Sequence, residues 1–314
     1  MTTAIGIDVG GTSLRAALVN KSGKIVRAQR RKLGERTPEA LLDQLEALLK
    51  SLDAEDASLP IAMGLAAITH LKTGVVAVAP NLGWRDVPFG DLLAARFKRP
   101  VRLVNDLDAI TVGEARCGAG RGADDVVCVF VGTGVGMGAV VHGRVLEGYN
   151  GTATELGHIK VTSAAEGRPC GCGERGCLET YASGRHLPDL LATEAAKGTK
   201  TRLLDEVKGD FKALTAERIE AAARDGDEAA LAVWRCAADH LGRAIGNVVT
   251  LLNPRVLILG GGVLNAALSL RRDVVAATTA YAGRVQLADL EIRESELGDH
   301  AGLVGAGLLA HQAR

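Results

Sequence analysis

The chain has 314 residues, of which 47% are hydrophobic and 24% charged, and its 37 lysines and arginines balance 37 aspartates and glutamates. This balance argues against a protein built to bind nucleic acid, and the scarcity of aromatic residues argues against base-stacking surfaces. The length predicts about two domains, and no segment approaches the roughly 18 consecutive apolar residues of a membrane span. The first residues lack the features of a secretion signal, so we expect a cytoplasmic protein.

The first third of the chain predicts closely spaced strands and then helices. Apolar runs at residues 4–9 and 14–19 and a strand from Lys24 are separated by short turns, which is typical of an antiparallel meander. Thr37 and Pro38 are an N-cap and a first helical residue, and leucines at helical spacing follow them. Further strands are expected at residues 60–66, 74–79 and 101–104, with helices at 91–97 and from Asp106 to about Arg116.

The remainder of the chain repeats part of this pattern. A strand at 125–131, a glycine-rich turn at 132–138 and a returning strand at 139–142 resemble the strand–turn–strand unit near Asp8, which we interpret as an internal duplication. Helices are expected to dominate from Leu178 to about Leu252. A strand at 255–259 and a closing helix at 301–311 follow.

The glycine-rich segment at residues 118–122 is the best candidate for a linker. We therefore predict an N-terminal α/β domain over residues 1–117, completed by the C-terminal helix at 300–314. A larger α/β domain over residues 118–299 would hold the cysteine cluster and two of the three glycine-rich turns.

Three glycine-rich turns follow predicted strands. Glycines at a strand end let backbone N–H groups approach an anion closely, although a single such turn is also typical of a simple tight hairpin. The chain has neither a Walker-type loop nor a Rossmann fingerprint. The first two turns could clamp a polyphosphate, and the third suits the close approach of a flat base or a ribose. The candidate residues are Asp8, Gly10, Gly11, Thr12, Gly132, Thr133, Gly134, Gly260, Gly261 and Gly262.

Asn105 and Asp106 stand where a strand ends and a helix begins. The pair could simply cap the helix. Alternatively, the Asp106 carboxylate could be a general base that accepts the proton of a hydroxyl during phosphoryl transfer. Position alone favours the cap.

The most specific local pattern is one histidine followed by three crowded cysteines, His158, Cys170, Cys172 and Cys177. One imidazole and three thiolates form a closed tetrahedral set that suits structural zinc, with no position left open for water. Cysteines crowded in this way are more typical of a metal site than of a disulfide framework. Glu155 and Glu179 flank the motif, and a zinc-bound loop would bring their carboxylates together around a small pocket.

These motifs resemble those of the ROK family of sugar kinases and sugar-responsive repressors, particularly its bacterial glucokinases. The resemblance covers nearly the whole chain, and the string C-G-C-G-x-x-G-C-L-E is highly specific. It implies an α/β protein with the actin-like, ribonuclease-H-like ATPase fold, in which two α/β domains flank a cleft. The segments that carry it are 8–15, 80–84, 104–106, 155–158, 170–179 and 259–263, together with the turn at Gly132.

The resemblance also implies roles for particular residues. Asp106 matches the catalytic base, which takes the proton of the sugar 6-hydroxyl. The turns at Gly10 and Gly132 match the phosphate loops, and Gly260 to Gly262 match the adenosine side, with magnesium accompanying ATP. The residues that match sugar ligands are Asn81, Asn105, Glu155, His158 and Glu179, of which His158 would also bind zinc.

The implied activity is transfer of the ATP γ-phosphoryl group to a hexose, with glucose favoured. Fructose, N-acetylglucosamine, N-acetylmannosamine and allose stay open as acceptors and polyphosphate as donor, because residues 64–70 lack the Pro, second Gly and Asp that are common in this segment of the family. A sugar-sensing repressor is the competing class. It is disfavoured because the first phosphate strand begins at Ala4, which leaves no room for a DNA-binding domain. We expect a homo-oligomer, dimer or tetramer, that binds neither nucleic acid nor membranes.

Overall fold

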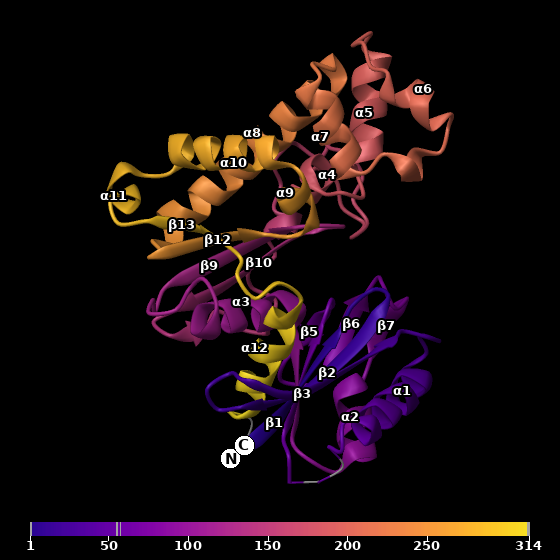
Figure 1. Cartoon of the computed structure of the whole chain (residues 1–314), viewed down its shortest axis with the longest axis vertical. Helices are drawn as coiled ribbons and strands as arrows, with labels where there is room; N and C mark the ends of the chain where they lie inside the picture. The colour runs from indigo at the N-terminus through magenta and orange to yellow at the C-terminus, as the bar shows by residue number, and fades with distance from the viewer. Residues whose placement is uncertain (1, 55, 57, 313–314) are drawn as a thin grey trace. The chain divides into compact units, whose positions relative to one another are not determined.

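The structure is a computed structural model that describes residues 2–54, 56 and 58–312 (Figure 1). The chain forms two compact units. The first unit comprises residues 1–127, 138–154 and 295–314, and the second comprises residues 128–137 and 155–294. This division differs from the predicted ranges, because residues 118–127, 138–154 and 295–299 pack with the first unit.

The first unit is built on a five-stranded sheet in the order β3-β2-β1-β4-β8. The first three strands form the antiparallel meander expected from the short turns, and β1, β4 and β8 are parallel neighbours. The strands are β1 (Thr3–Val9), β2 (Ser13–Asn20), β3 (Ile25–Lys32), β4 (Ile61–Leu65) and β8 (Val101–Asn105).

Helices cover both faces of this sheet (Figure 1). Helices α1 (Pro38–Ser51) and α2 (Phe89–Phe97) lie on one face, and α3 (Asp106–Cys117) and α12 (Ala301–Ala310) on the other. The N-cap is as predicted, because the hydroxyl of Thr37 accepts from the amide of Ala40 at 3.3 Å.

Successive residues of β1 point to opposite faces of the sheet, so this strand packs against helices on both faces. Ile5 and Ile7 belong to the same buried cluster as the leucines of α1. Gly6 points the other way, and a Cβ there would lie 2.2 Å from the carbonyl oxygen of Leu303 in α12. Only glycine allows α12 to pack this closely on β1.

A small antiparallel sheet of β5 (Ile68–His70), β6 (Val75–Ala79) and β7 (Trp84–Val87) completes the first unit. Only β6 was expected from the sequence. Trp84 packs on Phe89 at the start of α2, with ring centroids 4.6 Å apart. The turn between β6 and β7 carries Asn81.

Residues 118–122 were predicted as a linker, but they form a packed segment. Ala119 is buried, and its amide donates to Oε2 of Glu114 at 2.9 Å. A Cβ on Gly120 would lie 2.8 Å from the Cα of Ala115. The glycines therefore serve close packing against α3 rather than freedom of movement.

A second five-stranded sheet has the order β11-β10-β9-β12-β13. When the strands of each sheet are counted along the chain, both sheets have the spatial order third, second, first, fourth, fifth. Its strands are β9 (Val126–Val131), β10 (Val135–Val141), β11 (Arg144–Val145), β12 (Val256–Gly260) and β13 (Glu291–Glu294). The turn between β9 and β10 is shorter than predicted, because the strand already begins at Val135. The division between the two units passes through β9 and β10.

The second unit is rich in helices, as expected between residues 178 and 252. They are α4 (Glu179–Ala182), α5 (Leu187–Ala196), α6 (Leu203–Val207), α7 (Ala216–Arg224), α8 (Glu228–Leu252), α9 (Gly262–Ala266), α10 (Leu268–Tyr281) and α11 (Arg284–Leu287). Gly242 of α8 allows α10 to approach, since a Cβ there would lie 2.2 Å from the Cβ of Ala277. None of the helices in the described ranges combines the length and apolarity that crossing a bilayer requires.

Candidate functional site

The carboxyl ends of three parallel strands form one edge of the first sheet. The register pairs Val9 of β1 with Leu65 of β4, and Leu65 with Asn105 of β8. The residues that follow, including Gly10 and Asp106, therefore emerge at the same edge. In open α/β sheets this edge is where ligands bind.

Asn105 and Asp106 lie at the start of α3, where the capping interpretation places them. The amide of Leu107 donates to Oδ1 of Asn105 at 2.8 Å and to Oδ1 of Asp106 at 3.0 Å. Asn105 is thus the N-cap of α3, and its Nδ2 donates to the carbonyl of Ala67 at 3.5 Å. Asp106 is the first helical residue and is half-buried, at the helix end where negative charge is favoured.

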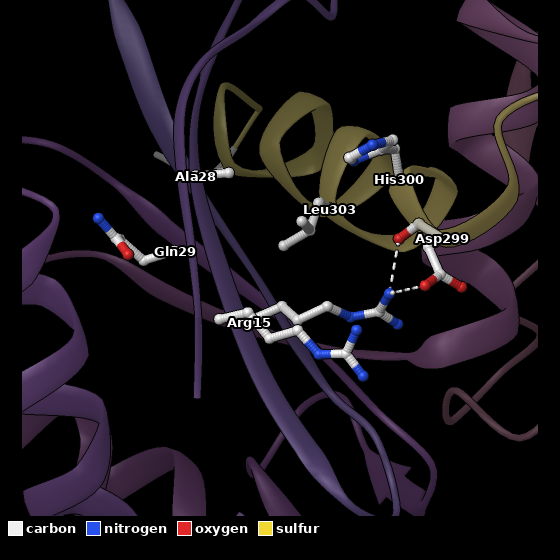
Figure 2. Close-up of a pocket in the computed structure, with 7 residues that line it drawn as sticks. Arg15, Ala28, Gln29, Asp299, His300 and Leu303 are labelled. Atoms are coloured by element: carbon white, nitrogen blue, oxygen red, sulfur yellow. Dashed lines mark hydrogen bonds and ion pairs between the residues drawn. The ribbon is translucent and has the colours of Figure 1, made fainter. Parts of the chain in front are cut away.

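Asp8 is a buried carboxylate near the end of β1. Burial raises its pKa above the usual value, while the guanidinium of Arg15, 2.5 Å away, acts in the opposite direction. Arg15 in turn donates to the carbonyl oxygen of Asp299 at 2.8 Å, at the approach to α12 (Figure 2). This interaction ties the first strand pair to the last helix.

Arg36 is a residue that the sequence analysis missed. Its Nη2 donates to the carbonyl of Gly11 at 2.9 Å, and its Nη1 donates to the carbonyl of Asn81 at 2.6 Å. Its own carbonyl accepts from Nε1 of Trp84 at 2.6 Å. Arg36 therefore brings the first glycine turn and the Asn81 turn together, and no local pattern in the sequence indicated it.

The second glycine turn is held by the segment that follows α4. The amide of Gly184 donates to the carbonyl of Gly132 at 2.8 Å, and the amide of Arg185 to the carbonyl of Thr133 at 3.3 Å. The third turn lies beside it, since a Cβ on Gly132 would be 3.9 Å from the amide nitrogen of Gly262. The structure thus brings two of the three predicted turns together within the second unit.

Gly261 is required by its conformation and its surroundings. Its φ is +95°, and a Cβ there would lie 2.4 Å from the carbonyl oxygen of Val131. A side chain would therefore force β12 and β9 apart at the point where the two glycine turns meet.

Glu179 and Glu155 lie near the second glycine turn. Oε2 of Glu179 accepts from the amide of Val135 at 3.1 Å, and a Cβ on Gly134 would lie 2.4 Å from the same oxygen. Burial raises the pKa of Glu155, the charge of Glu179 raises it further, and His158 acts in the opposite direction. The three predicted sugar ligands of this unit are therefore electrostatic neighbours.

The four predicted metal ligands converge. One ligand atom from each of His158, Cys170, Cys172 and Cys177 lies within 4.8 Å of the others. Nδ1 of His158 is 3.8 Å from Sγ of Cys170, so this nitrogen faces the thiols. Burial raises the pKa of the Cys170 thiol to about 12, a cost to thiolate formation that a bound cation would offset. The donor set and its spacing fit a tetrahedral zinc ion.

The predicted site residues thus form two groups. The first unit holds Asp8, Gly10, Gly11, Thr12, Asn81, Asn105 and Asp106. The second unit holds Gly132, Thr133, Gly134, Glu155, His158, Cys170, Cys172, Cys177, Glu179, Gly260, Gly261 and Gly262.

Comparison with known proteins shows to which protein family the chain belongs. Residues 4–313 match the ROK family, and the chain belongs to it. Its fold is accordingly the actin-like ATPase fold, as predicted.

The relatives of the chain include glucokinases and a repressor. The chain is 36% identical to the glucokinase of Halalkalibacterium halodurans, covering 98% of this chain and 94% of that protein. It matches the crystal structure of a ROK family glucokinase from Streptomyces griseus in complex with glucose and AMPPNP, with 32% identity, a TM-score of 0.79 and coverage of 99% and 100%. It is also 28% identical to the xylose repressor of Caldicellulosiruptor bescii, covering 96% of this chain and 76% of that protein.

Proposed function

We propose that the chain is an ATP-dependent hexose kinase that transfers the γ-phosphoryl group of ATP to the 6-hydroxyl of glucose, yielding glucose 6-phosphate. The observation that carries this proposal is the position of Asp106. It lies at the same edge of the parallel strands as the glycine turn after β1. Similarity over almost the full chain to glucokinases supports glucose as the acceptor and ATP as the donor.

Asp106 would act as the general base. A carboxylate within hydrogen-bond reach of the 6-hydroxyl accepts its proton as the oxygen attacks the γ-phosphorus. The amide of Leu107 donates to the side-chain oxygens of both Asn105 and Asp106 and so holds these side chains, which leaves little ordering for the moment of reaction.

Sugar binding would use hydrogen bonds to the hydroxyl groups of the sugar. Asn81 and Asn105 of the first unit and Glu155, His158 and Glu179 of the second are the proposed ligands. One oxygen of Glu179 is already used by the amide of Val135, which orients the other toward a sugar hydroxyl in this proposal.

The nucleotide would be held by backbone N–H groups of the glycine turns at Gly10, Gly132 and Gly260 to Gly262. Asp8 is the carboxylate beside the first of these turns and is the residue that we expect to hold magnesium. Magnesium held there with ATP would supply neutralisation of the phosphate charge.

Zinc would have a structural role. Four protein ligands leave the ion no open position for water. With Nδ1 of His158 facing the thiols, Nε2 is the nitrogen for a sugar hydroxyl. The ion would then fix the loop that carries Glu155, His158 and Glu179.

A different hexose is the first alternative, because residues 64–70 depart from the family pattern. A non-catalytic sugar-sensing regulator is the second, and the similarity to a xylose repressor favours it. We further propose a cytoplasmic location, a role in glycolysis and a homo-oligomeric state.

A coupled assay over a panel of hexoses, with ATP and polyphosphate as donors, tests the proposal. We expect Asp106→Asn to lower kcat about 10²–10⁴-fold while sugar binding is kept, since Asn preserves the shape but accepts no proton. Asp91→Asn, in the first turn of α2, is the matched control and should keep full activity. More than half of the wild-type kcat in the Asp106 variant would rule out this base, and no turnover with any pair would favour the regulator.

A further inference from the structure

A cavity of about 410 Å³ lies in the first unit, and its lining includes no residue of the proposed kinase site. Three arginines from three different elements line it. They are Arg102 of β8, Arg116 of α3 and Arg144 of β11.

The charges in this cavity are not balanced. Arg102 forms an ion pair with Glu147, whose carboxylate is the one acidic side chain among the described residues of the lining. Nη2 of Arg116 donates to the carbonyl oxygen of Gly143 at 2.5 Å, which orients the guanidinium without neutralising it. Arg144 has no ion pair or side-chain hydrogen bond within the part of the chain that the structure describes. Counted over the residues that the structure describes, the lining therefore carries two positive charges in excess.

Two unneutralised charges in one concave site suit a dianion. Guanidinium groups match phosphate oxygens with paired, charge-assisted hydrogen bonds, and Arg is the usual residue for this purpose. The volume lies in the range of small-molecule sites. Val112, Val140 and Leu309 add apolar surface, which suits the carbon skeleton of a phosphate ester.

We propose that this cavity binds a small phosphate-bearing anion, of the size of a phosphate monoester. The binding itself does not depend on the proposed kinase function. It would involve the elements that carry the candidate base, however. Arg102 lies on the strand that ends at Asn105, and Arg116 lies ten residues, about 15 Å, along the helix that begins at Asp106.

Isothermal titration calorimetry with inorganic phosphate and with glucose 6-phosphate tests this site. Saturating glucose and the non-hydrolysable analogue AMPPNP are present throughout, so that the proposed catalytic site is filled. We expect saturable binding that weakens at least about tenfold in Arg144→Ala and in Arg116→Ala, because each removes charge-assisted hydrogen bonds. Arg31→Ala, at an exposed position of β3, should bind as the wild type does.

The two probes distinguish a site for free phosphate from a site for a phosphate ester. Binding of both, or of glucose 6-phosphate alone, supports the site and tells whether the carbon skeleton is needed. Equal affinity in the wild type and the Arg144 variant, or no binding of either probe, would overturn it. If the kinase proposal were wrong, glucose and AMPPNP would leave the proposed catalytic site open. The difference in probe affinity between the wild type and the Arg144 variant would still show whether this cavity binds the anion.

Discussion

Glu114 should be one of the most sensitive positions for stability. Its side chain is fully buried in α3, and its carboxylate accepts from the amides of Ala119, Glu296 and Leu297 and from the hydroxyl of Ser295. These contacts hold the segments that follow α3 and precede α12. In Glu114→Gln the amide oxygen can replace only one carboxylate oxygen, so at least one buried donor would face an NH₂ group.

The expected loss follows from these hydrogen bonds. A hydrogen bond to a charged group contributes about 1.5–3 kcal/mol, and a buried donor left without an acceptor costs about 1–3 kcal/mol. We therefore expect Glu114→Gln to lower the free energy of unfolding by about 3 kcal/mol, which corresponds to roughly 6–12 °C in Tm. Glu114→Ala, which removes both oxygens, should cost more.

Chemical denaturation and hydrogen exchange measure this effect. The amides of Ala119 and Leu297 should lose protection in the Gln variant before the rest of the first unit does. Glu39→Gln, at an exposed position of α1, is the control and should change stability by less than about 0.5 kcal/mol. A Glu114→Gln variant within about 1 kcal/mol of the wild type, with protection unchanged, would refute the reasoning.

Three further predictions concern the rest of the site. Cys172→Ala should lower zinc content, Tm and sugar affinity together while nucleotide affinity changes less, and a zinc-free folded variant with normal sugar affinity would contradict this. Gly261→Ala should cost at least about 2 kcal/mol, because its φ of +95° and the Val131 carbonyl oxygen 2.4 Å from a new Cβ both oppose a side chain. Gly262→Ala, where a Cβ meets open space, should be tolerated. Burial raises the pKa of Asp8 above its usual 3.8, so the native state binds more protons than the unfolded state just above that pH. The stability of the wild type relative to Asp8→Asn, measured by denaturation at several pH values, should therefore fall as pH rises through that interval, and a constant difference would count against it.

Features that depend on nearby residues could be predicted from the sequence. The strands of the first meander, the Thr37 cap and the convergence of the metal ligands follow from alternation, local capping and close spacing along the chain. The order of the second sheet also agrees with the strand–turn–strand repetition seen in the sequence. Whether the predicted ligands bind sugar and nucleotide stays a prediction.

Features that depend on distant partners were decided only by the tertiary structure. The short strand β13 has little local pattern and exists because β12 lies beside it. Arg36 looks like any exposed arginine until the Gly11 and Asn81 turns, 25 and 45 residues away, supply its acceptors.

The segment after α3 shows the same limit most clearly. Its glycines predicted a linker, because glycine permits freedom where nothing surrounds it and close packing where something does. The outcome was set by Glu114, whose carboxylate accepts from Ala119 a few residues away and from Leu297, 183 residues away. A sequence determines which conformations glycine allows, but only the folded chain supplies the neighbour that selects one of them.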